Sequence, residues 1–130
     1  MPGFSSRSAA KLAECDEALQ RVFSRVVETF DCAILVGHRD KETQAEMFRS
    51  GKSKLDWPRS KHNSAPSMAI DVAPYPIDWT DRERFNFFAG FVLGVAREMG
   101  VELRWGGDWD GDWVLRDNTF DDLPHFELVP

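Results

Sequence analysis

Residues 68–73 carry the sequence MAIDVA, a short apolar run with one carboxylate, Asp71, near its middle. A run of this length between polar loops predicts a buried β-strand. A second apolar run, CAILV at residues 32–36, predicts another strand. A buried carboxylate is costly without a partner, so Asp71 requires a cation or, as the simpler alternative, the guanidinium of an arginine.

Amphipathic helices are predicted on either side of these strands, where apolar residues recur at intervals of three and four. The first covers residues 8–30. The second runs from an N-cap at Asp40 to about Arg49. A third contains the apolar positions between Phe85 and Met99.

Two further short strands are predicted at 101–105 and 125–129, with a loop rich in Gly and Asp at 106–119 between them. Residues 51–67 form a loop long enough to suggest a function. The chain contains no repeat and no low-complexity tract. We therefore expect a single α+β domain, residues 1–130, in which about three helices flank a small central antiparallel sheet.

The composition fits one folded domain with an acidic surface. The chain has 130 residues, of which 42% are hydrophobic, and a formal net charge of −6. This apolar content supports a core and excludes general disorder. DNA and anionic lipid bind basic surfaces, so we expect no nucleic-acid partner and no stable membrane binding.

Two cysteines, Cys15 and Cys32, fall in a predicted helix and at the start of a predicted strand. Thiols in such places usually behave as small apolar groups, so both are expected to be reduced and buried, and a disulfide is the alternative. Residues 1–7 lack the features of a secretory signal, and no window approaches the length of a membrane span. We expect synthesis in the cytoplasm without a signal peptide.

Two of the three histidines stand near carboxylates, because His62 precedes Asp71 by nine residues and His125 follows Asp122 by three. A hydrolytic zinc site needs three imidazole or carboxylate ligands and one position left for water. Each of these side chains taken alone is more often a solvated group. Together, His62, Asp71 and His125 supply the ligand set for one Zn²⁺ ion.

Asp122 is a candidate general base for such a site. A local turn between Asp122 and His125 would bring the carboxylate beside the reacting water, and Pro124 would stiffen that spacing. The neighbouring Asp121 is the competing candidate for the same role.

Two stretches, SKHNSAPSMAIDVAPYP at 60–76 and DLPHFE at 122–127, resemble the family of zinc D-Ala-D-Ala carboxypeptidases and L-alanyl-D-glutamate endopeptidases, especially its small phage endolysins. The similarity spans roughly residues 34–128. It implies zinc held by His62, Asp71 and His125, Asp122 as general base, peptidoglycan stem peptide as substrate, and an α+β fold. In many members the His and Asp are closer, with a Gly between them. The longer loop at 63–67 keeps the ligands but leaves its substrate contacts undefined.

The pair His38 and Arg39, together with Gln44, resembles the part of the family that contributes an arginine to the active site. Such an arginine would stabilise the oxyanion that forms when water attacks the peptide carbonyl. The alternative is a surface ion pair of Arg39 with Asp40 or Glu42. We expect His38 to point away from Arg39 and to lie outside the metal site.

Three residues are expected to contact substrate: Ser60, Gln44 and Trp109. Ser60 would share a face with His62 if the chain were extended there. Trp109 and Trp105 would line the substrate cleft, although tryptophan is more often a core residue.

Three aspartates at alternate positions, Asp108, Asp110 and Asp112, resemble the start of a calcium-binding loop. An EF-hand loop continues with Gly after the third acidic position and Glu at the twelfth, where this chain has Trp113 and Thr119. We therefore expect a solvated acidic loop.

The sequence thus predicts a monomeric zinc peptidase of phage endolysin type that cleaves the L-alanyl-D-glutamate bond of peptidoglycan in the periplasm. It would have no separate wall-binding domain and would depend on a holin to open the inner membrane. One alternative is a D-Ala-D-Ala carboxypeptidase, which would need a pocket for a free carboxylate. The other is a non-catalytic peptidoglycan-binding module with structural zinc. Asp122 argues against the module, because a structural site usually has four protein ligands and needs no base.

Overall fold

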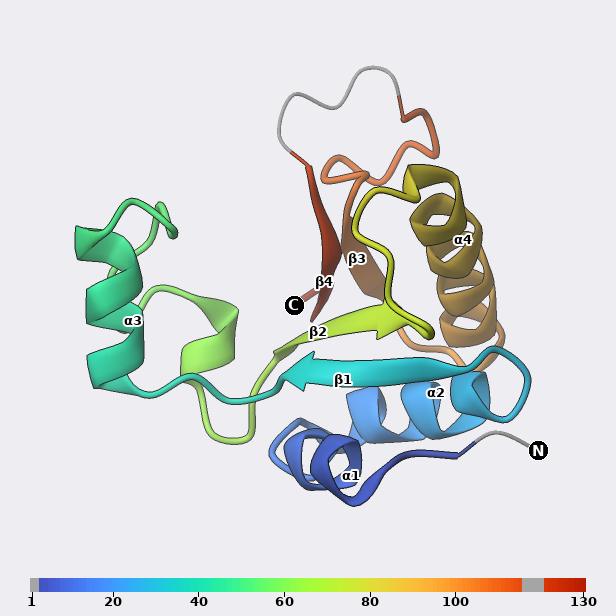
Figure 1. The fold of residues 1–130 in the computed structure, drawn as a ribbon, viewed down its shortest axis with the longest axis horizontal. Coiled ribbons are helices and arrows are strands. Elements are labelled where there is room, and N and C mark those ends of the chain that lie inside the picture. The colour runs from blue at the N-terminus through green and yellow to red at the C-terminus, as the bar shows by residue number, and fades with distance from the viewer. Residues whose placement is uncertain (1–2, 116–120) are drawn as a thin grey trace.

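The computed structural model describes residues 3–115 and 121–130 (Figure 1). The helices are α1 (Ser6–Leu12), α2 (Glu17–Val27), α3 (Lys41–Arg49), the 3₁₀ helix η1 (Lys61–Asn63) and α4 (Arg82–Glu98). The strands are β1 (Cys32–Val36), β2 (Ala69–Pro74), β3 (Leu103–Gly106) and β4 (Asp122–Leu128). Residues 116–119 of the expected loop at 106–119 lie outside the described residues.

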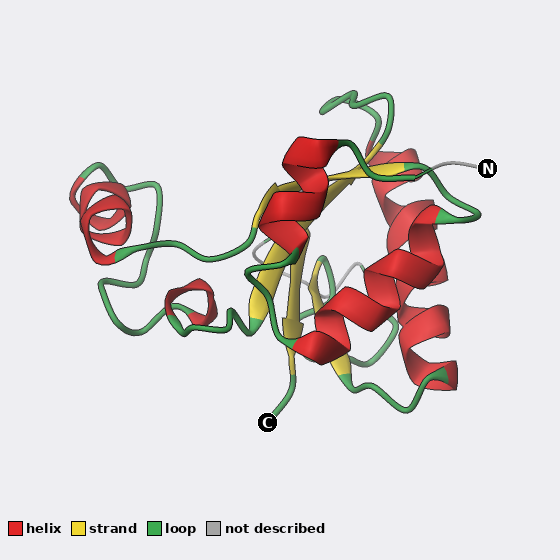
Figure 2. Cartoon of the chain, turned by 90° about the horizontal axis from the view of Figure 1, so that it is seen from below, coloured by secondary structure: helices red, strands yellow, loops and turns green. Residues whose placement is uncertain are grey.

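The four strands form one antiparallel sheet in the order β1-β2-β4-β3. This arrangement confirms the expected α+β fold. Helices α1, α2 and α4 lie together with the sheet, whereas α3 stands apart at the other end of the molecule, and η1 lies between α3 and the start of β2, which it contacts (Figures 1 and 2). Within the described residues, no helix is long and apolar enough to cross a membrane.

The hydrophobic core lies between the sheet and the helices α2 and α4. Ile70, Val72 and Phe126 are fully buried in it. Side chains alternate between the two faces of a strand, so Asp71 and His125, which are paired across β2 and β4, point to the opposite face. The core therefore fixes the face on which the polar residues gather.

The single helix expected over residues 8–30 is wrong, because the chain leaves the helical conformation between α1 and α2. Asp16 caps α2 by accepting a hydrogen bond from the Ala18 backbone N–H at 2.9 Å. The backbone around this break pairs with Ser67, which accepts from Asp16 at 2.8 Å and donates to Glu14 at 2.9 Å. The apolar spacing does not reveal the break, because Leu12, Cys15 and Leu19 are all buried although they lie before, in and after it.

Both cysteines are reduced and buried, as predicted. Burial raises the pKa of the Cys15 thiol and of the Cys32 thiol to about 12. Both therefore remain neutral core residues at physiological pH.

Helix α3 begins and ends as its sequence predicts. The Asp40 carboxylate accepts a hydrogen bond from the Thr43 N–H at 2.8 Å, and the helix ends before Gly51, which has a φ of 81°. The short connection from β1 to α3 contains Arg39, so the cap also helps to place that residue.

Candidate metal centre

Three side chains from separate segments meet on the polar face of the sheet. His62 comes from η1, Asp71 from β2, and His125 from the position opposite Asp71 on β4. The Asp71 Oδ1 atom lies 3.2 Å from His62 Nε2 and 3.2 Å from His125 Nδ1. All three donor atoms lie within 4.8 Å of one another.

This donor set fits a zinc ion. Two atoms that each bind a tetrahedral zinc at the usual bond lengths lie about 3.4 Å apart, close to the spacing seen here. His62 Nδ1 donates to the Gly37 carbonyl at 2.8 Å, so its Nε2 carries the free lone pair. His125 Nε2 faces Glu127 Oε1 at 2.8 Å, which leaves Nδ1 directed at Asp71. Each imidazole is therefore oriented by a hydrogen bond on its far side.

The electrostatics of the centre favour positive charge. Burial alone would raise the pKa of Asp71, but the neighbouring His125 and His62 side chains outweigh burial and hold that pKa well below its usual range. Burial alone would lower the pKa of His125, but its hydrogen bonds to Asp71 and Glu127 raise it to about 9. The carboxylates on either side of His125 therefore stabilise positive charge at this point of the site.

Glu127 is a component of the site that the sequence analysis missed. Its side chain is 11% exposed, and its Oε2 atom lies 3.1 Å from Lys61 Nζ and 3.4 Å from Arg104 Nη1. Burial would raise the pKa of Glu127, but His125 and Lys61 lower it to about 2. The available signal was spacing, because a residue two positions after His125 on a strand lies on the same face.

Asp122 lies at the start of β4 rather than in the expected local turn. Gly106 of β3 pairs with Asp122, whereas the preceding β3 residue pairs with Phe126, so β4 bulges between these two positions. A Cβ atom at Gly106 would lie 2.0 Å from the Asp122 carbonyl oxygen, so this close pairing requires glycine. The bulge explains how Asp122 and His125, three residues apart on a strand, share one face.

The Asp122 carboxylate lies beside the ligand group at a longer distance. Its Oδ2 atom is 3.9 Å from His125 Nδ1. Burial and, after it, the charge of Asp71 raise the pKa of Asp122. The competing residue Asp121 forms an ion pair with Arg82 at the start of α4.

The Arg39 guanidinium is directed at the same centre. Its Nη2 atom lies 4.0 Å from Asp71 Oδ2, and its Nη1 donates to Gln44 Oε1 at 3.1 Å. The alternative surface pair with Asp40 or Glu42 does not describe this geometry, since the Arg39 side chain is only 11% exposed.

The residues expected to contact substrate occupy three different environments. Gln44 is completely buried and hydrogen-bonded to other residues of the protein, which does not fit the expected direct contact with substrate. Ser60 caps η1 and accepts from the His62 N–H at 3.3 Å, so the chain there is not extended as assumed. The Trp109 ring lies 5.4 Å from the His125 ring and is partly exposed, whereas Trp105 is a core residue.

His38 lies near the centre without joining the ligand group. Its Nε2 atom is 3.2 Å from the Asn63 carbonyl oxygen. His38 is therefore not one of the candidate ligands, which at this centre are His62, Asp71 and His125.

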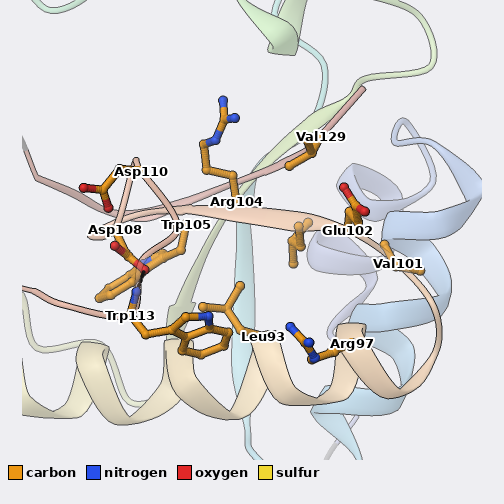
Figure 3. A pocket seen from close by; sticks show the side chains of 12 residues that line it. Leu93, Arg97, Val101, Glu102, Arg104, Trp105, Asp108, Asp110, Trp113 and Val129 are labelled. Carbon is orange, nitrogen blue, oxygen red and sulfur yellow. Dashed lines mark hydrogen bonds between the residues drawn. The ribbon is translucent and has the colours of Figure 1, made fainter.

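The acidic loop forms a second group of carboxylates, from Asp108, Asp110 and Asp112. Asp110 and Asp112 are exposed, as expected for a solvated loop, but Asp108 is buried and accepts from the Trp113 N–H at 2.9 Å. Figure 3 shows Asp108 and Trp113 at a cavity of about 340 Å³ between α4 and β3. This cavity is lined by other residues than the three candidate ligands.

The chain is similar in sequence and in structure to known proteins. A family profile described as phage L-alanyl-D-glutamate peptidase matches residues 2–129. L-alanyl-D-glutamate peptidase of Escherichia phage T5 is 35% identical over 136 aligned positions, which cover 97% of each chain. The crystal structure of Serratia marcescens L-Ala D-Glu endopeptidase ChiX has a TM-score of 0.80 at 28% identity, covering 98% of this chain and 91% of that chain. A shorter match, 36% identical over 53 positions of NADH-ubiquinone oxidoreductase chain 6 of Carassius auratus, covers 41% of this chain and 30% of that protein.

Proposed function

The chain belongs to the phage L-alanyl-D-glutamate peptidase family, and on this basis we propose that it is a zinc endopeptidase that cleaves the L-alanyl-D-glutamate bond of peptidoglycan. Membership confirms the resemblance recognised in the sequence. The observation that carries the proposal is the convergence of His62, Asp71 and His125 with Asp122 beside them. Three protein ligands leave a coordination position for water, as catalytic zinc sites do.

Zinc, when bound by these residues, would supply a Lewis acid that eases deprotonation of water and polarises the peptide carbonyl. Asp122 would accept the proton of the attacking water at its carboxylate and then donate that proton to the leaving amine. Its raised pKa suits both transfers, because the carboxylate becomes a stronger base and its acid form persists closer to neutral pH.

Arg39 would bind the oxyanion that develops on the attacked carbonyl. The guanidinium stays charged and offers several donors in one plane, and its burial excludes competing water. Glu127 and the Gly37 carbonyl would hold the two imidazoles in the tautomers that ligation requires.

The biological setting follows as part of the same proposal. The enzyme would act as a monomeric endolysin on the stem peptide of the cell wall, with residues 1–130 as one catalytic domain. Peptidoglycan lies in the periplasm, so a protein made in the cytoplasm would depend on a holin to reach it.

Digestion of purified peptidoglycan by the zinc-loaded protein tests this function. Mass spectrometry should detect stem peptides with a new N-terminal D-glutamate. Released D-alanine would instead indicate a carboxypeptidase, and no cleavage of either bond at full zinc loading would indicate a binding module.

Substitution Arg39→Lys should lower kcat more than it raises KM and leave the zinc content unchanged. Lysine keeps the charge but cannot donate both to Gln44 and to the oxyanion from one planar group. Removal of one oxyanion donor lowers kcat by about 10²- to 10³-fold, and we expect the loss in kcat to approach that size. Steady-state kinetics and metal analysis check this, and a near-normal kcat would exclude an oxyanion role for Arg39.

Substitution Glu127→Gln should weaken zinc binding by about 10- to 100-fold, because the neutral amide no longer raises the basicity of His125. Competition with a chromophoric chelator measures the affinity. Glu98→Gln, an equivalent change at an exposed position of α4, is the matched control. Equal zinc affinity in both variants would contradict the role of Glu127.

A further inference from the structure

The buried residue Gln44 uses its whole carboxamide in hydrogen bonds. Its Nε2 donates to Ser53 Oγ at 3.0 Å and to the Leu55 carbonyl at 2.5 Å. Its Oε1 accepts from Arg39 Nη1 at 3.1 Å and from Asn63 Nδ2 at 3.1 Å. A buried polar group with all its partners present is held firmly, since losing any of them leaves an unsatisfied group.

These partners allow only one orientation of the amide. The Leu55 carbonyl can only accept, so it requires the Nε2 atom, and the Arg39 guanidinium can only donate, so it requires Oε1. The oxygen of Gln44 therefore points at Arg39 and cannot exchange places with the nitrogen.

Asn63 connects Gln44 and Arg39 to the candidate ligand His62, which precedes Asn63 in sequence. Its Nδ2 also donates to the Arg39 carbonyl at 3.2 Å, while the Arg39 N–H donates to the His62 carbonyl at 2.8 Å. The backbone of Arg39 is thus bonded to η1 in both directions, and its side chain is bonded through Gln44. Few degrees of freedom remain for the guanidinium.

The bond from Gln44 also decides which part of the guanidinium faces the site. Nη1 is occupied by Gln44, whereas Nη2 is directed toward Asp71. A free arginine side chain has considerable rotamer entropy to lose on ordering. In this arrangement that entropy is lost on folding and not during the reaction.

We propose that Gln44 is a positioning residue that aims the Arg39 guanidinium at the developing oxyanion, without itself touching substrate or zinc. This proposal rests on the proposed function, because it assigns Gln44 an effect only through Arg39. It replaces the direct substrate contact expected from the sequence.

A double-mutant cycle tests the proposal. Gln44→Met keeps the length of the side chain and removes both polar atoms. It should lower kcat by about 10- to 100-fold, with a smaller change in KM and with zinc still stoichiometric. In an Arg39→Met background the same change should cost little more in kcat, because the residue through which Gln44 acts is absent.

Gln44→Glu separates positioning from stability. The carboxylate keeps the oxygen to which Arg39 donates but faces the Leu55 carbonyl without a donor, so the variant should be destabilised yet keep most of its kcat. If Gln44 had only a structural role, the loss of kcat in each of the two variants would be in proportion to its loss of thermal stability. Gln20→Met on α2, which loses a glutamine hydrogen bond to Cys15, is the matched control with expected wild-type kcat.

All rates are expressed per zinc-loaded molecule. A normal kcat in Gln44→Met, or an equal loss with and without Arg39, would overturn the positioning role while leaving the peptidase function intact. Should Gln44→Met fail to fold, Gln44→Glu decides: a kcat near wild type supports the proposal, and a loss as large as that of Arg39→Met overturns it. A normal kcat in Arg39→Met would overturn the role of Arg39 in the proposed function and this proposal with it.

Discussion

Replacing His125 with alanine should abolish zinc binding and peptidase activity together. His125 contributes one of three candidate ligand atoms, and a site with two remaining protein ligands holds zinc far more weakly. Asp71 and Glu127 would also lose the imidazole that lies between them. Since bound zinc stabilises the folded state, the melting temperature of the variant should no longer rise when zinc is added.

Metal analysis after gel filtration and thermal unfolding with and without added zinc measure this outcome. His38→Ala is the matched control, because it removes a histidine near the centre that lies outside the ligand group. The control should keep one zinc per chain. Stoichiometric, tightly held zinc in His125→Ala would contradict the ligand assignment.

Replacing Asp122 with asparagine should leave zinc in place and remove most of the activity. The side chain keeps its shape, but the amide cannot accept the proton of the attacking water. General base catalysis contributes about 10² to 10⁴ in rate, so we expect a kcat loss on that scale with near-normal stability. The distance of 3.9 Å from His125 Nδ1 is consistent with a carboxylate beside the ligands.

Asp121→Asn is the matched control for this experiment. Its carboxylate pairs with Arg82 on α4, a largely exposed interaction whose loss should change stability and rate only slightly. Loss of zinc from Asp122→Asn would make Asp122 a ligand. Undiminished wall digestion by that variant would assign the base to another residue.

The local elements of the fold could be predicted from the sequence because their causes are local. The apolar run at 32–36 forms β1 with the expected bounds, and α3 begins after Asp40 and ends before Gly51 as its capping residues require. The resemblance to the peptidase family could also be recognised from the sequence, because the motif containing His62 and the motif containing His125 are each an unbroken stretch of residues.

Other features depend on contacts between distant segments, and periodicity does not reveal them. The break between α1 and α2 is held by backbone bonds to Ser67, more than fifty residues away in sequence. The early start of β4 depends on pairing with Gly106 across a bulge. Both of these differences from the predicted elements arise at such long-range pairings.

The sequence by itself determined which chemical groups are available to this protein: two imidazoles, a carboxylate within an apolar strand, and a further aspartate close to the second histidine. Only the tertiary structure decided their geometry. The register of β2 on β4 sets Asp71 opposite His125, and the hydrogen bonds of Glu127 and Gln44 orient His125 and Arg39. The physical reason is that side-chain chemistry is a property of each residue, whereas distance and orientation depend on packing between segments far apart in the chain.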